Sequence, residues 1–364
     1  MKGSTMDIIT ATRQYETWLR KQIQVVDADI IQKHANMAED PFIHLRATAY
    51  YWALRWPMLC PDLTGVSHVN SVRDLHIENF GTWRDSEGRL VWGVNDFDEA
   101  YPGPWTEDPT RLSTSVAIAK SCGLISVPVK DACAAILTGY EKGLRKGPSP
   151  FVLSHRHAKL GKMANGEMRD PHSFWQKMLL LPPATDVPRD VQEILRSALP
   201  AGFDVQFKTR RAGQGSLGHP RYVALADCYG GYIAREAKAL TPSTAAFALG
   251  LDTSKYFYQE TEDAAARSKD PFLQIRNGWI IRRLSPHCSR IELSQLKLAN
   301  GFVLLKAMGR ELANVHAAQP EVRERILDEF NDLPKGWLRD ATETMCEDGI
   351  ANWRVWSRYW RKAA

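Results

Sequence analysis

Hydrophobic and polar positions change their period along the chain, and each change predicts a different kind of element. From residue 6 to residue 56, apolar residues recur every three or four positions with few Gly or Pro, which predicts helices. Pro41 is expected to open the second of them. Between residues 66 and 97 the pattern shortens into strands and loops, and Gly88 predicts the turn of a hairpin. Further helices are expected at 108–122, 127–145 and 172–181, followed by a Pro-rich linker at 181–188.

The second half of the chain has a different texture. Residues 203–240 alternate as strands do on both sides of a glycine-rich loop, and 272–284 predict a hairpin that turns at Asn277-Gly278. A long helix is expected from Glu292 to His316, and the tail is expected to be helical to its end.

The composition is typical of a globular protein. A chain of 364 residues allows one large or two modest domains, and 44% hydrophobic residues support a substantial core. The net charge of +5 is compatible with anionic substrates such as nucleotides and is too small to predict nucleic-acid binding. No apolar run is long enough to span a membrane. The six cysteines are scattered and the chain begins without an apolar signal region, so a reducing, cytoplasmic location is expected.

The strongest chemical signal is a pair of acidic motifs. Asp74 and Asn79 are five residues apart, and Asp96 and Asp98 follow after a short strand-like insert. Mg²⁺ prefers hard oxygen ligands, and kinases place an Asp near the acceptor hydroxyl and an Asn and a second Asp on the metal ions. The motifs therefore predict a kinase-type site that uses ATP and Mg²⁺. Turn capping is the alternative for Asp74 and Asn79.

A glycine-rich loop is the second signal. Gly213, Gly215 and Gly218, with Ser216 between them, match a GxGxxG pattern, but His219-Pro220 and a strand-like run follow instead of a helix. This order does not fit a dinucleotide-binding fold, and it is typical of the loop that covers phosphates in kinases. A plain glycine hairpin is the alternative.

The strand after the glycine loop is expected to deliver a cation to the phosphates. Lys238 has the preferred chemistry, and Arg235 is closer to the expected spacing, so both remain candidates. Glu236 lies between them, either as the ion-pair partner of this cation or as a solvated strand residue.

The motifs together resemble the DUF2252 family of uncharacterised bacterial proteins, which is placed with the kinase-like superfamily. The hallmarks of that family are PFxxxRG, GDxHxxNFG, NDFDE and GSxG motifs. The corresponding segments here are Pro41-Phe42-Ile43-His44-Leu45-Arg46, Arg73-Asp74-Leu75-His76-Ile77-Glu78-Asn79-Phe80-Gly81, Asn95-Asp96-Phe97-Asp98-Glu99 and Gly215-Ser216-Leu217-Gly218.

The resemblance implies an α+β, two-lobed protein-kinase-like fold that is circularly permuted relative to protein kinases and aminoglycoside phosphotransferases. The catalytic loop comes first here, and the glycine loop, a hinge near 285–290 and the helix ending at His316 come second. The expected domains are a helical lobe at 1–200, a small antiparallel β lobe that binds nucleotide at 201–290, and C-terminal helices at 291–364 that pack back on the helical lobe.

The resemblance also implies residue roles. Asp74 orients or deprotonates the acceptor hydroxyl, with His76 bracing its loop. Asn79 and Asp96 hold Mg²⁺, and Asp98 is either a further ligand of the ion or a carboxylate behind its ligands. The nucleotide phosphates are expected to lie against Gly213, Gly215, Ser216 and Gly218, with Arg235 or Lys238 as the cation.

Two departures from the family pattern bear on turnover. Arg73 replaces the glycine before Asp74, where a cation is able to pair with Asp74 and change its basicity. Arg235 replaces a lysine, and an arginine binds phosphate with a different geometry. Asp108 is expected to cap the helix that follows it, or else to tie back to the catalytic loop. Arg46 is expected either to form an ion pair or to reach a phosphate.

The leading function is therefore an ATP- and Mg²⁺-dependent phosphotransferase acting on an unknown small molecule or protein. The alternatives are a catalytically impaired nucleotide-binding protein, an AMP transferase and a metal-dependent phosphohydrolase. His155, His157 and His172 are not expected to bind metal, because no carboxylate accompanies them at ligand spacing. Trp353, Trp356 and Trp360 share one helical face, which predicts docking on the core, with a membrane-surface helix as the alternative.

Overall fold

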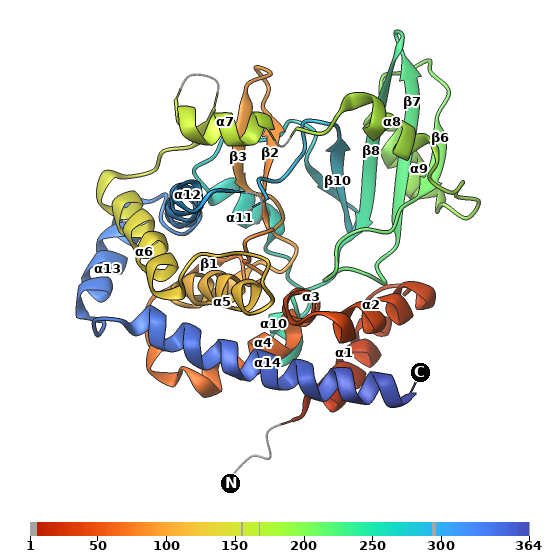
Figure 1. Ribbon diagram of the computed structural model, residues 1–364. Helices are drawn as coiled ribbons and strands as arrows, with labels where there is room; N and C mark the ends of the chain where they lie inside the picture. The colour runs from red at the N-terminus through yellow and green to blue at the C-terminus, as the bar shows by residue number, and fades with distance from the viewer. Residues whose placement is uncertain (1–5, 154–155, 167, 293–295, 364) are drawn as a thin grey trace.

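Helices make up most of the molecule, and its largest sheet is gathered on one side (Figure 1). The computed structural model describes residues 6–153, 156–166, 168–292 and 296–363. The predicted α+β class is confirmed. The boundaries of the three expected domains stay predictions.

Four short helices form the N-terminal part of the chain, as the apolar period predicted. Asp40 accepts hydrogen bonds from the backbone N–H groups of Phe42 and Ile43, and Pro41 occupies the first helical position, so the third helix has both of its expected start signals. The helices are α1 (Ile8–Gln22), α2 (Asp27–Glu39), α3 (Pro41–Ala47) and α4 (Ala49–Leu59), with a 3₁₀ turn at Pro61–Leu63.

The main helical body is built from five helices. They are α5 (Glu107–Ser121), α6 (Val129–Lys146), α12 (Leu298–His316), α13 (Pro320–Asp332) and α14 (Trp337–Ala363). The predicted helices at 108–122 and 127–145 are confirmed. The helix predicted from Glu292 begins at Leu298, and residues 293–295 lie outside the described part of the chain.

The tail docks on the core, as its tryptophan face predicted. Helix α14 runs along the bottom of the molecule in Figure 1 and packs against α5 and α2. Trp356 is buried, and its Nε1 donates a hydrogen bond to the carbonyl oxygen of His34 (3.1 Å). Within the described residues, we find no helix with the length and apolar character needed to cross a membrane.

Three antiparallel sheets carry the strands. The predicted hairpin around Gly88 is β2 (Phe80–Arg84) and β3 (Leu90–Val94), extended by β5 (Phe151–Val152), and β1 (His68–Ser71) pairs with β4 (Tyr101–Pro104). The largest sheet has the strand order β6-β7-β8-β10-β9. Its strands are β6 (Gln206–Thr209), β7 (Arg221–Cys228), β8 (Gly231–Ala239), β9 (Gln274–Arg276) and β10 (Trp279–Leu284).

Helices cover both faces of the large sheet. Apolar residues of α9 (Arg189–Ser197) pack with Ala237 and Ile281 on one face, and those of α8 (Pro171–Leu179) pack with Val223 and Ala234 on the other. The predicted linker at 181–188 joins these two helices, and its Pro183 forms a bridge to Lys208.

Four short helices were not predicted. They are α7 (Ala158–Gly166), α9, α10 (Thr244–Leu249) and α11 (Tyr258–Ala264). Six to nine residues give barely two turns, so the helical period has little room to appear in the sequence.

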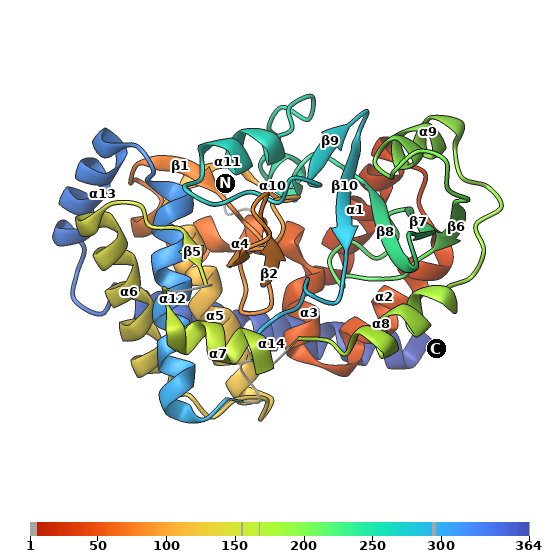
Figure 2. The same cartoon turned by 90° about the horizontal axis from the view of Figure 1, so that it is seen from above.

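The central contact of the helical body is the pair α6 and α12, which lie side by side in both views (Figures 1 and 2). A Cβ atom on Gly139 would collide with the backbone of Lys306, and one on Gly309 would collide with the backbone of Ile136. The glycines therefore let the two helix backbones approach closely.

Replacing Gly309 by Ala tests this close approach. An exposed helical Gly→Ala change stabilises by about 1 kcal/mol, whereas here the methyl group meets backbone and we expect a loss of about 1–3 kcal/mol in the free energy of unfolding. Urea unfolding measures the change. Gly65→Ala is the control, because its Cβ meets nothing within 4 Å. A stabilised Gly309→Ala variant would show that the helices are not in this contact.

Candidate functional site

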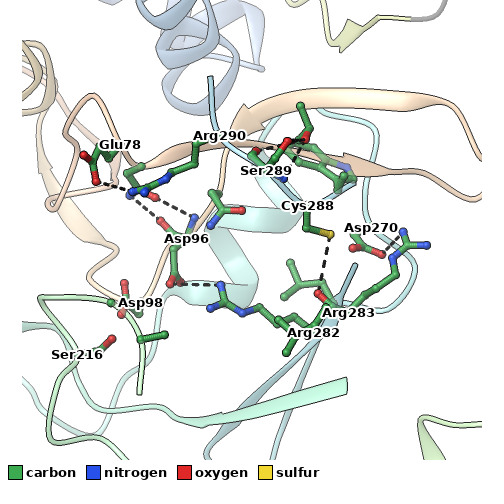
Figure 3. A pocket seen from close by; sticks show the side chains of 18 of the residues that line it. Glu78, Asp96, Asp98, Ser216, Asp270, Arg282, Arg283, Cys288, Ser289 and Arg290 are labelled. Atoms are coloured by element: carbon green, nitrogen blue, oxygen red, sulfur yellow. Dashed lines mark hydrogen bonds and ion pairs between the residues drawn. The ribbon is translucent and has the colours of Figure 1, made fainter. Parts of the chain in front are cut away.

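A cavity of about 470 Å³ lies between the helical body and the large sheet, and several predicted site residues line it. Figure 3 labels three of them, Asp96, Asp98 and Ser216. The acidic motifs reach it from the loops beside β2 and β3, and the glycine-rich loop reaches it from between β6 and β7. The predicted residues that line it are Asp74, His76, Asn79, Asp96, Asp98, Gly213, Gly215 and Ser216. Segments that are far apart in the sequence thus share one cavity.

Asp74 is held by an arginine that the sequence analysis missed. The fully buried Arg111 of α5 pairs with Asp74 Oδ1 and also donates to the carbonyl oxygen of Leu45 (3.1 Å). Burial raises the pKa of Asp74 to about 6, against the opposing effect of Arg111. Asp74 is therefore mostly ionised at neutral pH but close enough to its pKa to exchange a proton.

His76 is placed as a neutral neighbour of Asp74. Its Nε2 lies 4.0 Å from Asp74 Oδ2, and its Nδ1 accepts a hydrogen bond from the backbone N–H of Glu78 (3.2 Å). Burial and the nearby arginines, Arg46 first, hold the pKa of His76 well below its ordinary value. The ring thus carries no charge at neutral pH, and its bond to Glu78 braces the loop.

Asn79 joins the two acidic motifs through their backbones. Its Nδ2 donates to the carbonyl oxygens of Asp74 (3.2 Å) and Asp96 (3.1 Å), and its Oδ1 accepts from the backbone N–H of Asp96 (3.1 Å). The amide therefore fixes the spacing between Asp74 and Asp96, and its oxygen is already engaged in one hydrogen bond.

Lys238 and Arg235 lie on opposite faces of the large sheet, because residues three apart along a strand such as β8 point to opposite faces. Lys238 is 1% exposed, and its Nζ lies 2.9 Å from Asp96 Oδ2 and 2.5 Å from Asp98 Oδ2. Arg235 points away and stacks on the ring of Phe272, 3.9 Å from its centroid. Lys238 is thus the cation of this strand that faces the carboxylates.

The two carboxylates retain capacity for a metal ion. Within the described residues Asp96 Oδ1 is buried without a hydrogen-bond partner. Burial opposes the ionisation of Asp98, but Lys238 outweighs it and lowers the pKa of Asp98. Charged, oxygen-only and partly unpaired, this pair fits a hard cation such as Mg²⁺.

The glycine-rich loop is fastened to helix α2. Lys33 Nζ donates to the carbonyl oxygen of Gly215 (2.8 Å), and the backbone N–H of Val26 donates to that of Gly218 (2.9 Å). Gly218 has a φ of +99° and no room for a Cβ against Ile30. Burial lowers the pKa of Lys33 to about 8. The loop is therefore held close to Asp74, whose Oδ2 is 3.6 Å from the place of a Cβ on Gly215.

Beside the glycine-rich loop lies a cluster of three arginines that was not predicted. Arg210, Arg221 and Arg282 all pair with Glu236, which is fully buried. Glu236 thus is an ion-pair partner and not a solvated residue, although its cations come from other strands. Burial opposes its ionisation, but the arginines hold the pKa of Glu236 well below its ordinary value. Arg282 also lies 3.8 Å from Asp96 Oδ2, so the cluster shares both carboxylates, and all three arginines line the cavity.

Asp108 ties back to the loop that carries Asp74, and the predicted helix cap is wrong. Its carboxylate accepts from the backbone N–H groups of Val72 (2.7 Å) and Arg73 (2.8 Å), whereas Thr106 holds the cap position of α5. His316 Nε2 lies 2.8 Å from the same carboxylate, and Tyr140 contacts the other ring nitrogen. The approach to Asp74 is therefore fixed from the helical core.

Arg73 does not pair with Asp74. It has a φ of 65°, a left-handed conformation that glycine adopts freely and other residues adopt with strain. Its guanidinium turns to Glu107 (2.5 Å) and the carbonyl oxygen of Pro102 (2.8 Å), through space left by Gly103.

The remaining predicted residues are also placed. Arg46 forms an ion pair with Glu78 (2.6 Å), which Arg290 also contacts, and both arginines line the cavity. His155 lies outside the described residues. In the part of the chain that the structure describes, no group of three His, Cys, Asp or Glu side chains is arranged to hold a metal ion by itself.

The missed residues share a reason. Arg111, Lys33 and the three arginines around Glu236 come from elements distant in sequence from their partners, and none of them stands in a recognisable motif. The one signal in the sequence was Glu236 itself, a carboxylate between Arg235 and Lys238 in a predicted strand, which suggested an ion pair without naming the partner.

Residues 25–168 match the model of a family described as "Uncharacterized protein conserved in bacteria (DUF2252)". The match supports the predicted relation to that family, and it contains both acidic motifs but not the glycine-rich loop. Comparisons with curated proteins and with solved structures give no match.

Replacing Arg73 by Gly tests the role of this departure from the family pattern. Relief of the left-handed conformation gains about 1–2 kcal/mol, but an unpaired buried Glu107 costs about 3–5 kcal/mol. We therefore expect a net loss in the free energy of unfolding, measured with urea. The double variant Arg73→Gly/Glu107→Gln is the control and should recover most of the loss. A single variant more stable than the parent would contradict the pairing.

Proposed function

We propose that this protein is an ATP- and Mg²⁺-dependent phosphotransferase of the kinase-like type. The observation that carries the proposal is the single cavity on which Asp74, Asp96, Asp98 and the glycine-rich loop converge, with Lys238 bridging its two sides. Carboxylates for metal, a loop for phosphates and an acid–base group for the acceptor are the parts that phosphoryl transfer requires.

The arrangement of the large sheet supports the kinase-like relation. A glycine-rich loop joins two antiparallel strands, the next strand carries Lys238, and residues 285–290 connect the sheet to the helical body along the cavity. This connection is fastened to β2, because the backbone N–H of Thr82 donates a hydrogen bond to the carbonyl oxygen of Ser289 (2.8 Å). In this proposal the fold is a permuted kinase-like fold, with the order of the two halves reversed along the chain.

Asp74 has the features of the group that receives the acceptor proton. Arg111 fixes Oδ1, which leaves Oδ2 toward the cavity side of the glycine-rich loop. Its raised pKa makes it a better base than an ordinary Asp while it stays ionised at neutral pH. His76, neutral and adjacent, keeps the loop in place without competing for the proton.

Asp96 and Asp98 would hold Mg²⁺, and the bound ion would neutralise charge on the transferred phosphoryl group. Lys238, which contacts both carboxylates, would stand beside the ion and favour binding of an anionic phosphate. The guanidinium groups of Arg210, Arg221 and Arg282, which line the same cavity, would also favour a polyanion.

The positions of Arg73 and Arg235 are relevant to the alternative function, a nucleotide-binding protein with impaired catalysis. One pairs with Glu107 and the other stacks on Phe272, so neither side chain interferes with Asp74 or with the carboxylates. An AMP transfer would use the same residues, and mass spectrometry of the product separates the two by the mass of a phosphate or of an adenylate.

Asp96→Asn tests the proposed metal site. It keeps the size of the side chain and removes the charge, and we expect Mg²⁺-dependent consumption of ATP to fall by about 10²–10³-fold. The matched control is Asp227→Asn, an exposed carboxylate at the end of β7, which should change nothing. Equal rates in both variants would argue against phosphotransfer at this site.

The pH dependence tests Asp74. Since its pKa is raised to about 6, the base form is lost as the pH falls through about 6, and kcat/KM should drop tenfold per pH unit below that point. Arg111 lowers this pKa, so in Arg111→Met the drop should move to higher pH. Asp74→Asn should show little activity at any pH. A parent profile that stays flat down to pH 4 would contradict this role.

A further inference from the structure

A second hollow lies on the helical body, between α6, α7 and α12. Its volume is about 390 Å³, within the range of roughly 300–1,000 Å³ that is common for small-molecule pockets. It shares no lining residue with the central cavity, so it does not belong to the proposed phosphotransfer site. We call it the α6–α12 groove.

The walls of the α6–α12 groove are apolar. Phe151 and Leu160 are buried beneath it, and Val303 and Ala307 face it from α12. The close approach of α6 and α12 at Gly139 fixes the floor, because a side chain at that position would meet the backbone of the other helix. The hollow is therefore part of a rigid helix pair.

Around these apolar walls stand only positive charges. Lys142, Lys159, Lys306 and Arg310 line the groove, and among the described residues that line it none is acidic. None of the four forms an ion pair within the described chain.

Arg310 is the cation set deepest in this group. It is half-buried, it lies 5.7 Å from the centre of the Phe151 ring, and its Nε is buried without a partner within the described chain. Lys306 lies one turn away on the same face of α12, since helical residues four apart are neighbours. Burial lowers the pKa of Arg310. An anion at this place would supply the missing partner.

We propose that the α6–α12 groove binds a small amphiphilic anion, an aliphatic chain of medium length that carries a carboxylate. The chain would cover the apolar walls, and the carboxylate would meet Arg310 and Lys306. A bare inorganic anion would leave the walls exposed to water, and an uncharged chain would leave the cations unpaired. Charge complementarity and size therefore select a ligand with both parts.

Calorimetry with decanoate below its micelle concentration tests the site on the full chain. Decanoate is expected to bind, and decanol and acetate, which lack the charge or the chain, are expected to bind far more weakly. Affinity should also fall with added salt, because the cations are partly exposed.

Two variants locate the binding. Ala307→Trp fills the groove and should abolish decanoate binding, and Lys306→Met/Arg310→Met should weaken it roughly five- to tenfold. Lys130→Met, an exposed lysine at the other end of α6, is the matched control and should bind as the parent does. Circular dichroism melting shows that each variant is folded.

Equal binding of decanoate and decanol, unchanged affinity in Ala307→Trp, or no binding to the folded parent would each overturn the proposal. None of these outcomes depends on consumption of ATP, so the proposal for the α6–α12 groove and the proposal for the phosphotransfer site are tested independently.

Discussion

A buried ammonium group on the large sheet connects the two halves of the site. Lys238 is almost completely removed from water, and such a charge costs several kcal/mol unless it is paired. Its partners, Asp96 and Asp98, come from the helical body about 140 residues earlier in the chain. The sheet can bury Lys238 only by lying over these carboxylates, so the position of the cavity follows from one ion-pair cluster.

The same constraint accounts for the supports around the cavity. Several groups that face it are held by a second group behind them: Asp74 by Arg111, the loop before it by Asp108 and His316, and the arginine cluster by Glu236. Helix α2 holds the glycine-rich loop through Lys33. These supports fix Asp74, its loop and the glycine-rich loop, which is the preorganisation that the proposed phosphotransfer would need.

Elements with a long period or a marked turn were predictable from the sequence. The helices at 108–122 and 127–145, the hairpins at Gly88 and Asn277-Gly278, and the docking of Trp356 all follow from local patterns. The short helices α7, α9, α10 and α11 have too few turns to show a period. The motif residues could be named, but their partners could not. The tertiary fold determines which side chain becomes the partner of a buried polar or charged group, as Arg111, Glu107 and Lys33 show. Asp108 shows the same limit. An Asp before a helix usually caps it, but here the carboxylate accepts hydrogen bonds from the backbone of the loop at Val72 and Arg73.

The most direct test of the account is a crystal structure with Mg²⁺ and a non-hydrolysable ATP analogue. The account predicts the phosphates between the loop at Gly213–Gly218 and Asp96, with the metal ion on Asp96 and Asp98 and Lys238 beside it. A nucleotide bound outside this cavity, or a cavity that stays empty at saturating nucleotide, would contradict it.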